Sequence, residues 1–99
     1  MDRSVAGFDW DAGNRTKCRK HGVSVEEIEA VFHGGPSVYA DPLHSIEEQR
    51  LRAIGRTSAG RFVLVAFTFR EKGGVTLIRP ISARYMHDKE VRHYERQRP

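Results

Sequence analysis

Cysteine and long apolar segments are nearly absent from this sequence. Its one cysteine, Cys18, cannot form an internal disulfide bond or, by itself, a thiolate zinc site. The longest apolar run, residues 62–69, is too short to span a bilayer, and residues 1–5 lack the apolar segment of a secretory signal. A chain of 99 residues has room for one hydrophobic core. We therefore expect a single domain over residues 1–99, no membrane contact and a cytoplasmic location.

Several common site motifs are missing as well. The chain has no glycine-rich phosphate loop, no dinucleotide fingerprint, no paired cysteines and no Gly-x-Ser-x-Gly sequence. The five histidines are scattered along the chain, at positions 21, 33, 44, 87 and 93. A metal site would have to be assembled from distant segments. We therefore expect neither a metal ion nor an organic cofactor.

Positive charge is concentrated in the second half of the chain. Residues 1–49 carry five Lys or Arg against nine Asp or Glu, whereas residues 50–99 carry twelve against four. Thirteen of the 17 basic residues are arginine, whose planar guanidinium group pairs with two phosphate oxygens and stacks on bases. This bias favours a nucleic acid as partner, and the alternative is an ordinary solvated surface.

Apolar periodicity and turn residues divide the chain into eight elements. In order, they are a strand at 5–10, a helix at 12–21, a helix that Ser24 caps and Gly34 ends, strands at 37–40, 48–56, 62–70 and 75–84, and a helix at 88–97. Consecutive strands favour antiparallel pairing. The order β-α-α-β-β-β-β-α therefore predicts an α+β fold in which helices flank a small antiparallel sheet.

Three local signals make this prediction specific. Ser24 and Glu27 have the spacing of a capping box, which marks the start of the second helix. Residues 62–70 are almost entirely apolar, which suits a central strand buried on both faces. Pro80 cannot donate a backbone hydrogen bond, so it indicates an edge strand or a bulge.

Arginines recur along the predicted strands. There are six of them: Arg50, Arg52, Arg56, Arg70, Arg79 and Arg84. The first three share one face because their spacings are even. Strands about 4.8 Å apart would arrange such residues in a grid that suits a bent single-stranded RNA backbone. Alternatively, about half of the arginines serve the fold by pairing with carboxylates. The candidate partners are Asp41, Glu47, Glu48 and Glu90.

Cleavage of RNA without a metal needs a base for the 2′-hydroxyl, cations for the phosphorane and an acid for the 5′-oxygen. His21 lies among basic residues at a predicted helix end, so it is a candidate for proton transfer, and capping of the helix is the alternative. Tyr94 either stacks on a base or moves a proton, or else belongs to the core. We expect Cys18 to be inert and Glu90 to pair with an arginine such as Arg84.

Two groups of residues carry a family resemblance. In the first half they are Phe8-Asp9-Trp10-Asp11, Asn14, Lys20-His21-Gly22-Val23-Ser24, Glu27 and Ala30-Val31-Phe32. In the second half they are Glu48-x-Arg50, Gly55, Thr68-x-Arg70, Arg79-x-Ile81-Ser82-Ala83-Arg84, Glu90 and Tyr94-Glu95. Together they resemble the BrnT family of bacterial toxins over nearly the whole chain.

This resemblance implies a RelE-like ribonuclease fold and a type II toxin that inhibits translation by cleaving RNA. It also implies a DNA-binding antitoxin, BrnA, in a complex of two toxins with an antitoxin dimer that reaches operator DNA only through the antitoxin. Arg79 and Arg84 are then assigned to the phosphorane, Lys20, Arg50, Arg52 and Arg70 to the RNA backbone, and His21 or Tyr94 to proton transfer. Pro80 departs from the family pattern and could tilt Ser82 and Arg84.

The leading hypothesis is thus a metal-independent endoribonuclease. A second hypothesis is a basic module that binds nucleic acid or assists repression without catalysis, because positive charge indicates binding more directly than turnover. It predicts salt-sensitive binding with no cleavage products. A third hypothesis is an inactive relative that serves only as a structural partner in the repressor complex.

Overall fold

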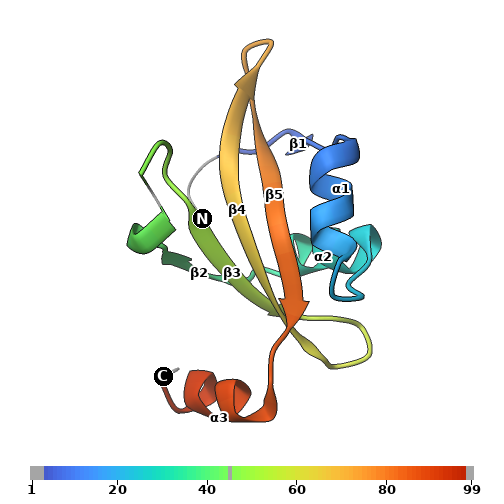
Figure 1. The fold of residues 1–99 in the computed structure, drawn as a ribbon, viewed down its shortest axis with the longest axis vertical. Coiled ribbons are helices and arrows are strands. Elements are labelled where there is room, and N and C mark those ends of the chain that lie inside the picture. The colour runs from blue at the N-terminus through green and yellow to red at the C-terminus, as the bar shows by residue number, and fades with distance from the viewer. Residues whose placement is uncertain (1–3, 45, 98–99) are drawn as a thin grey trace.

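The helices and strands follow one another in the order that the sequence predicts, which confirms the α+β class (Figure 1). The computed structural model describes residues 4–44 and 46–97. Its elements are β1 (Gly7–Phe8), α1 (Ala12–Arg19), α2 (Val25–His33), β2 (Ser37–Ala40), the short 3-10 helix η1 (Pro42–His44), β3 (Leu51–Arg56), β4 (Phe62–Lys72), β5 (Val75–Tyr85) and α3 (Asp88–Gln97). The first strand is shorter than predicted, and residues 48–50 precede β3 rather than belonging to it.

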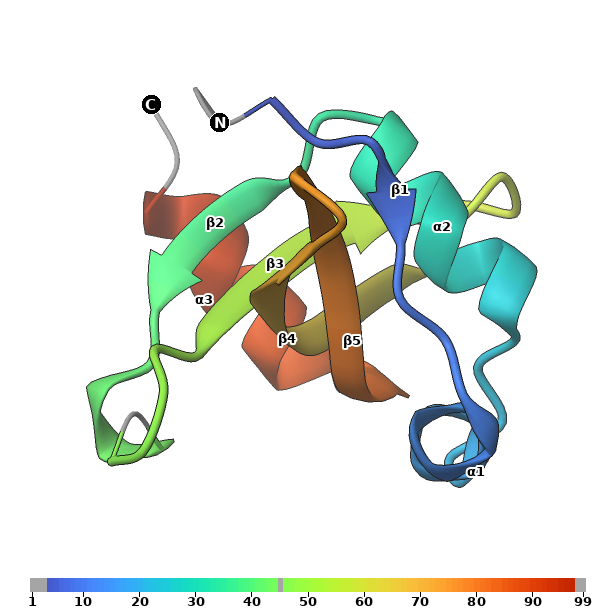
Figure 2. The same ribbon diagram turned by 90° about the horizontal axis from the view of Figure 1, so that it is seen from above.

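The strands form one sheet in the order β1-β5-β4-β3-β2. Neighbours from β2 to β5 are antiparallel, as predicted. β1 is instead parallel to β5, with Gly7 opposite Leu77 and Phe8 opposite Ile78, so the sheet is mixed and not wholly antiparallel. The cause is topological, because α1 and α2 carry the chain to the far edge of the sheet before the antiparallel meander returns to β1 (Figure 2).

The first two helices begin where the sequence places them. The Ser24 side chain accepts a hydrogen bond from the Glu27 backbone N–H, and the Glu27 carboxylate accepts one from the Ser24 backbone N–H, which confirms the capping box. Asp11 and Asn14 make the same reciprocal pair at the start of α1. Each capping box satisfies two backbone N–H groups that the start of the helix would otherwise leave without a partner. Local chemistry therefore determines where both helices start.

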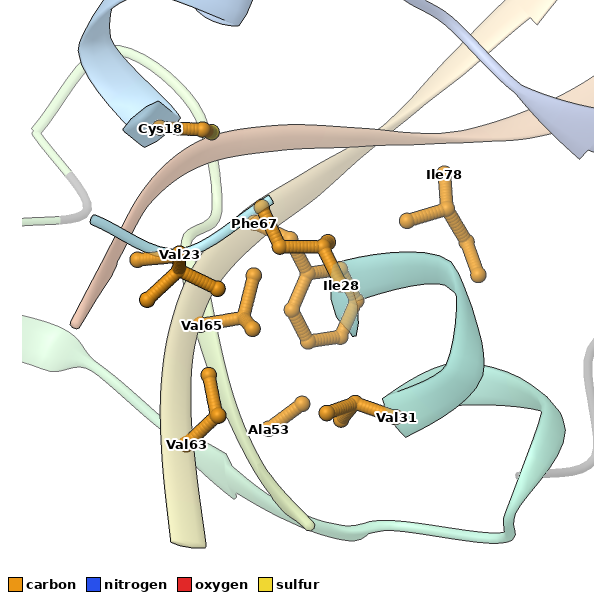
Figure 3. Packing of buried hydrophobic residues seen from close by; sticks show 10 residues of the cluster. Cys18, Val23, Ile28, Val31, Ala53, Val63, Val65, Phe67 and Ile78 are labelled. Atoms are coloured by element: carbon orange, nitrogen blue, oxygen red, sulfur yellow. The ribbon is translucent and has the colours of Figure 1, made fainter. Parts of the chain in front are cut away.

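The hydrophobic core lies between these helices and one face of the sheet. Its buried members are Cys18, Val23, Ile28, Val31, Ala53, Val63, Val65, Phe67, Ile78 and Ala83. Ile28 and Val31 project from α2 toward the strands, and Phe67 lies among them (Figure 3). Truncation of a fully buried side chain such as Ile28 to alanine costs about 2–5 kcal/mol of stability.

Over residues 62–66 only one face of β4 is buried, so the prediction that both faces are buried is wrong there, although Thr68 further along the strand is covered and bonded to the Gln49 carbonyl. Val63, Val65 and Phe67 are fully covered, whereas Leu64 and Ala66 between them are only partly covered. The reason is that α1 and α2 lie together on one side, and α3 lies apart from them beyond the end of β5 (Figure 1). We call the side of the sheet that carries Leu64 and Ala66 the open face.

A bulge interrupts β5 at the predicted proline. Phe67 of β4 is opposite Pro80, but Ala66 is opposite Ser82, which leaves Ile81 as an extra residue. Proline suits this position because it has no backbone N–H to contribute to the ladder. Of the two alternatives that the sequence left open, the structure has the bulge, since β5 lies between β1 and β4 and is not an edge strand.

The bulge decides which face the arginines of β5 occupy. Side chains alternate along a strand, and before the bulge Ile78 and Pro80 are buried on the core side. After it, Ala83 occupies the core side. Arg79 and Arg84 are five residues apart and would face opposite sides of a regular strand, but the extra residue puts both on the open face.

Asn14 fastens α1 to this bulge. Its buried side chain donates hydrogen bonds to the backbone carbonyls of Pro80, at 2.8 Å, and Asp9, at 2.9 Å. The side-chain oxygen accepts from the backbone of Asp11 at 2.7 Å. A single amide therefore links the start of α1, the end of β1 and the irregular part of β5, which a shorter or apolar side chain could not do.

α3 is attached to the open face through one buried aromatic residue as well as through the pair of Glu90 with Arg84. Tyr94 is only 7% exposed, its hydroxyl lies 2.6 Å from Ser37 Oγ, and its ring meets Phe62 edge to face at 5.7 Å. The rest of α3 is mostly polar. In the described part of the chain, no helix has the length and apolar character needed to cross a bilayer.

Candidate active site

Two rows of side chains cross the open face. Pairing between neighbouring strands aligns Tyr39, Arg52, Ala66 and Ser82 in one row and Ser37, Ile54, Leu64 and Arg84 in the next. Arg52 and Arg84 are two strands and one row apart, which puts their Cα atoms about 12 Å from each other. The small side chains of Ala66 and Ser82 lie between them. The surface is therefore depressed at Ala66 and Ser82, and the long side chains of Arg52 and Arg84 border this depression.

A hollow of about 520 Å³ lies over this part of the sheet. Its lining consists of His21, Asp41, Pro42, Leu43, His44, Arg50, Arg52, Leu64, Ala66, Ser82, Ala83 and Arg84. Four of the eight residues that the sequence predicts as functional are brought together here: His21, Arg50, Arg52 and Arg84. We call this cavity the arginine hollow. Its charge suits an anion, because three guanidinium groups face one carboxylate.

His21 reaches the arginine hollow because of how α1 ends. Lys20 is the C-cap of the helix, and Gly22 has a φ of 88°, a left-handed conformation that glycine adopts without strain. The chain turns there before Ser24 starts α2. His21 is consequently exposed at the rim of a site whose other residues come from β4, β5, β3 with Arg50 just before it, and residues 41–44, which we call the η1 segment.

Arg84 enters the hollow with a carboxylate partner. Its guanidinium group donates two hydrogen bonds to Glu90 of α3, at 2.7 and 2.8 Å, which confirms the predicted pair. The hydrogen bonds from Arg84 lower the pKa of Glu90 to about 2, and the same contact raises the pKa of Arg84. A guanidinium group has five N–H donors, so this pair leaves donors for another anion.

A second basic hollow, of about 320 Å³, lies beside the first. Arg50 lines both hollows, and Arg70 and Arg79 line the second. Arg70 pairs with Glu48, a partner that the sequence offered. The two hollows are thus joined through Arg50 into one cationic surface across the sheet.

The partners of Arg79 are carboxylates that the sequence did not suggest. Arg79 contacts Asp9 at 3.3 Å and Asp11 at 2.9 Å, and its side chain is only 21% exposed. Asp9 also accepts a hydrogen bond from Lys72 at 2.9 Å, which is the main reason that its pKa lies below the ordinary value. Arg79 therefore joins β5 to the segment between β1 and α1.

Comparison with known protein families gives one match. A family model described as ribonuclease toxin, BrnT, of type II toxin–antitoxin systems matches residues 10–90. The chain belongs to the BrnT family. It is accordingly a ribonuclease toxin of a type II system, a class of toxin that has an antitoxin as partner. A search of curated proteins gave no significant match.

The BrnT match covers the whole arginine hollow, whose lining lies between His21 and Arg84. It also includes the second hollow and ends at Glu90, within α3. The open face therefore belongs to the part of the chain that is shared with ribonuclease toxins. The end of α3, with Tyr94, lies outside that part.

Two of the expected BrnT site residues, Lys20 and Tyr94, line neither the arginine hollow nor the second basic hollow. Lys20 is exposed on the helix end and does not line either basic hollow. Tyr94 is buried against Phe62 and Tyr39 and bonded to Ser37, so its hydroxyl is already engaged. Tyr94 does line a further hollow of about 530 Å³ together with Arg52 and Arg84, between the sheet and α3, whereas Lys20 does not line it.

The hollow also contains three polar residues, Asp41, His44 and Ser82, that were not predicted as site residues from the sequence. Asp41 and His44 form an ion-pair contact at 3.1 Å in the η1 segment, and Ser82 lies on the floor between the arginines. The Asp-x-x-His spacing was the available signal, since residues three apart lie on one side of a helical turn. Among residues 4–44 and 46–97, no three His, Cys, Asp or Glu side chains are grouped as a metal site would require.

Proposed function

We propose that this BrnT toxin is a metal-independent endoribonuclease that cleaves RNA in the arginine hollow and so inhibits translation. The observation that carries the proposal is the convergence of His21, Arg52 and Arg84, from three distant segments, on a low floor of Ala66 and Ser82. A phosphate that binds between the two arginines would exchange its hydrogen bonds to water for hydrogen bonds from the guanidinium groups. The same cations would stabilise the extra negative charge of the phosphorane.

The arginines divide into two roles in this proposal. Arg52 and Arg84 stabilise the phosphorane, because they border the floor of the hollow from opposite sides. Arg50, which lines both hollows, guides the RNA backbone toward the second one. At the second hollow, Arg70 and Arg79 attract the RNA backbone electrostatically, while their carboxylate partners hold the two arginine side chains in place. We therefore assign Arg79 to attraction of the RNA backbone and not to the phosphorane, the role that the family resemblance implied.

The remaining sequence-predicted residues take other roles in this proposal. His21, at the rim of the hollow, transfers a proton, since imidazole titrates nearest neutral pH. Lys20 adds positive charge beside it without reaching the floor of the site. Tyr94 holds α3 against the sheet through Ser37, and we assign it no chemical step.

The antitoxin in this proposal is a BrnA-like, DNA-binding protein that presents acidic residues to the open face, because opposite charges favour fast and specific association. The complex contains two toxins and an antitoxin dimer and reaches operator DNA through the antitoxin. The toxin acts in the cytoplasm, where its RNA substrate is found. Mass measurement of the co-purified complex tests the stoichiometry.

Incubation of the purified toxin with a long RNA transcript in EDTA tests the activity directly. We expect wild-type protein to cut the RNA, and Arg52→Ala and Arg84→Ala each to slow cutting by about 100-fold or more. Arg92→Ala, which removes the same charge from an exposed position on α3, should cut at the wild-type rate. Each variant should first be shown to unfold cooperatively near the wild-type temperature.

The binding-module hypothesis makes the opposite prediction in the same experiment. It expects a salt-sensitive complex with RNA and no cleavage product at any concentration of toxin. RNA that stays intact with wild-type protein in EDTA but is cut on addition of Mg²⁺ would contradict metal independence alone. RNA that stays intact in both conditions, and also in the presence of ribosomes, would contradict the proposed activity.

A further inference from the structure

The η1 segment holds a histidine against a carboxylate at the edge of the arginine hollow. His44 Nδ1 lies 3.1 Å from each oxygen of Asp41. The Asp41 side chain is 12% exposed, whereas that of His44 is 64% exposed. The buried carboxylate thus fixes one side of the imidazole ring, and most of the ring remains open to the hollow and to solvent.

This contact determines which ring nitrogen is available. When Nδ1 carries the proton and donates it to Asp41, the other nitrogen, Nε2, has a free lone pair. A carboxylate in this position also stabilises the imidazolium that forms when Nε2 takes up a proton. The same arrangement orients histidine bases in other enzymes, where the carboxylate itself stays ionised.

We propose that His44 is the general base of the cleavage reaction and that Asp41 positions it. This inference rests on the proposed ribonuclease function, because it names a catalytic residue for that activity. His44 would act as the catalytic residue, since its Nε2 would touch the reacting hydroxyl. Asp41 is a positioning residue, since it acts only through His44.

The proposed step is an internal transesterification of RNA. Nε2 of His44 takes the proton of a 2′-hydroxyl while the 2′-oxygen forms a bond to phosphorus. The bond from phosphorus to the 5′-oxygen breaks, and that oxygen takes a proton from the imidazolium of His21. The products are a 2′,3′-cyclic phosphate and a 5′-hydroxyl. Exchange with water returns both histidines to their starting forms, so the step needs no oxidant, metal or other reactant.

Several charged groups surround His44. From the arginine hollow these are His21, Asp41, Arg50, Arg52 and Arg84. A neighbouring hollow of about 300 Å³, which His44 also lines, adds Glu47 and Glu48. Asp41 is the one carboxylate whose oxygens contact His44 in the described residues. The cations on the β3 and β5 side attract phosphate toward the base.

Cleavage of a long RNA in EDTA under single-turnover conditions, between pH 5 and 9, tests the inference. We expect His44→Ala to slow cleavage by about 100-fold or more. Added imidazole should restore part of that rate, because it can enter the space that the side chain leaves. Asp41→Asn should slow cleavage by about 10-fold while the toxin concentration that gives half the maximal rate stays unchanged, since Asp41 orients the base and does not contact RNA.

His87→Ala is the matched control, because His87 is an exposed histidine outside the hollow. It should leave the rate unchanged, and thermal unfolding should confirm that all variants fold. A wild-type toxin that fails to cleave RNA would overturn the proposed function and this inference together. A cleaving wild type would overturn the inference alone in either of two cases: His44→Ala stays within about threefold of its rate, or imidazole restores nothing and Asp41→Asn cleaves at the wild-type rate.

Discussion

Arg84 and Glu90 are joined by two parallel hydrogen bonds, one at 2.7 Å and the other at 2.8 Å. The pair connects β5 to α3, and Arg84 also borders the arginine hollow. The arginine that we assign to the phosphorane therefore also holds the C-terminal helix. Its carboxylate partner limits the mobility of the guanidinium group and leaves part of it for an anion.

The Arg84–Glu90 pair predicts a loss of stability in acid. Because the pKa of Glu90 is lowered from 4.5 to about 2, this group stabilises the fold above its unfolded pKa. That contribution is lost as the pH falls from about 4.5 toward 2. Glu90→Gln should therefore flatten the acid limb of melting temperature against pH. Asp88→Asn, on the same helix, is the control, and equal acid limbs for both variants would contradict the pair's contribution.

Tyr94 gives a second prediction, which separates a structural role from a chemical one. Tyr94→Phe removes the hydrogen bond to Ser37 and should lower the free energy of unfolding by about 1 kcal/mol. Tyr94→Ala also removes the ring contact with Phe62 and should cost about 3–5 kcal/mol. RNA cleavage by Tyr94→Phe should stay close to that of wild type. A large loss of cleavage with unchanged stability would instead assign Tyr94 to proton transfer.

Val31 of α2 lies close above Gly55 of β3. A Cβ atom at this position would lie 2.9 Å from Val31 Cγ1, closer than atoms pack in proteins. Gly55→Ala should therefore lower the free energy of unfolding by about 1–3 kcal/mol in chemical denaturation. Val31→Ala in the same chain should recover part of that loss, because it removes the clashing methyl group. Additive losses in the double variant would show that the two residues do not compete for space.

Cys18 should be an unreactive thiol in the folded protein. Its side chain is fully buried, and burial raises its pKa to about 11, so little thiolate is present at neutral pH. Labelling by iodoacetamide should follow global unfolding and speed up sharply with denaturant. Rapid labelling of the native protein at neutral pH would contradict the packing of α1 on the core.

Interactions between residues close in the chain could be predicted from the sequence. The capping box of Ser24 and Glu27 spans three residues, and the Arg84–Glu90 pair spans six, so local geometry determines both. Pro80 predicted an irregular strand for a similar reason, because the missing N–H is a property of one residue. The Asp41–His44 contact is equally local and could have been found in the same way.

Interactions set by topology could not be predicted. The pairing of Arg79 with Asp9 joins residues 70 positions apart, and it depends on β1 lying beside the last strand. The apolar run in β4 predicted burial on two faces, but composition does not show how many helices are available to cover a sheet. The proximity of His21 to Arg52 could not be predicted either, because it depends both on where α1 ends and on the register of the strands.

Backbone amide NMR shifts of the toxin, recorded with an RNA analogue that lacks the attacking 2′-hydroxyl, test the central claim most directly. Without that hydroxyl the strand binds but cannot be cut by transesterification. We expect the largest shift changes at Ala66, Ser82 and Arg84 and around His21, and no change on the exposed side of α2 near Glu26. Changes centred on α2, with the arginine hollow unaffected, would contradict this claim.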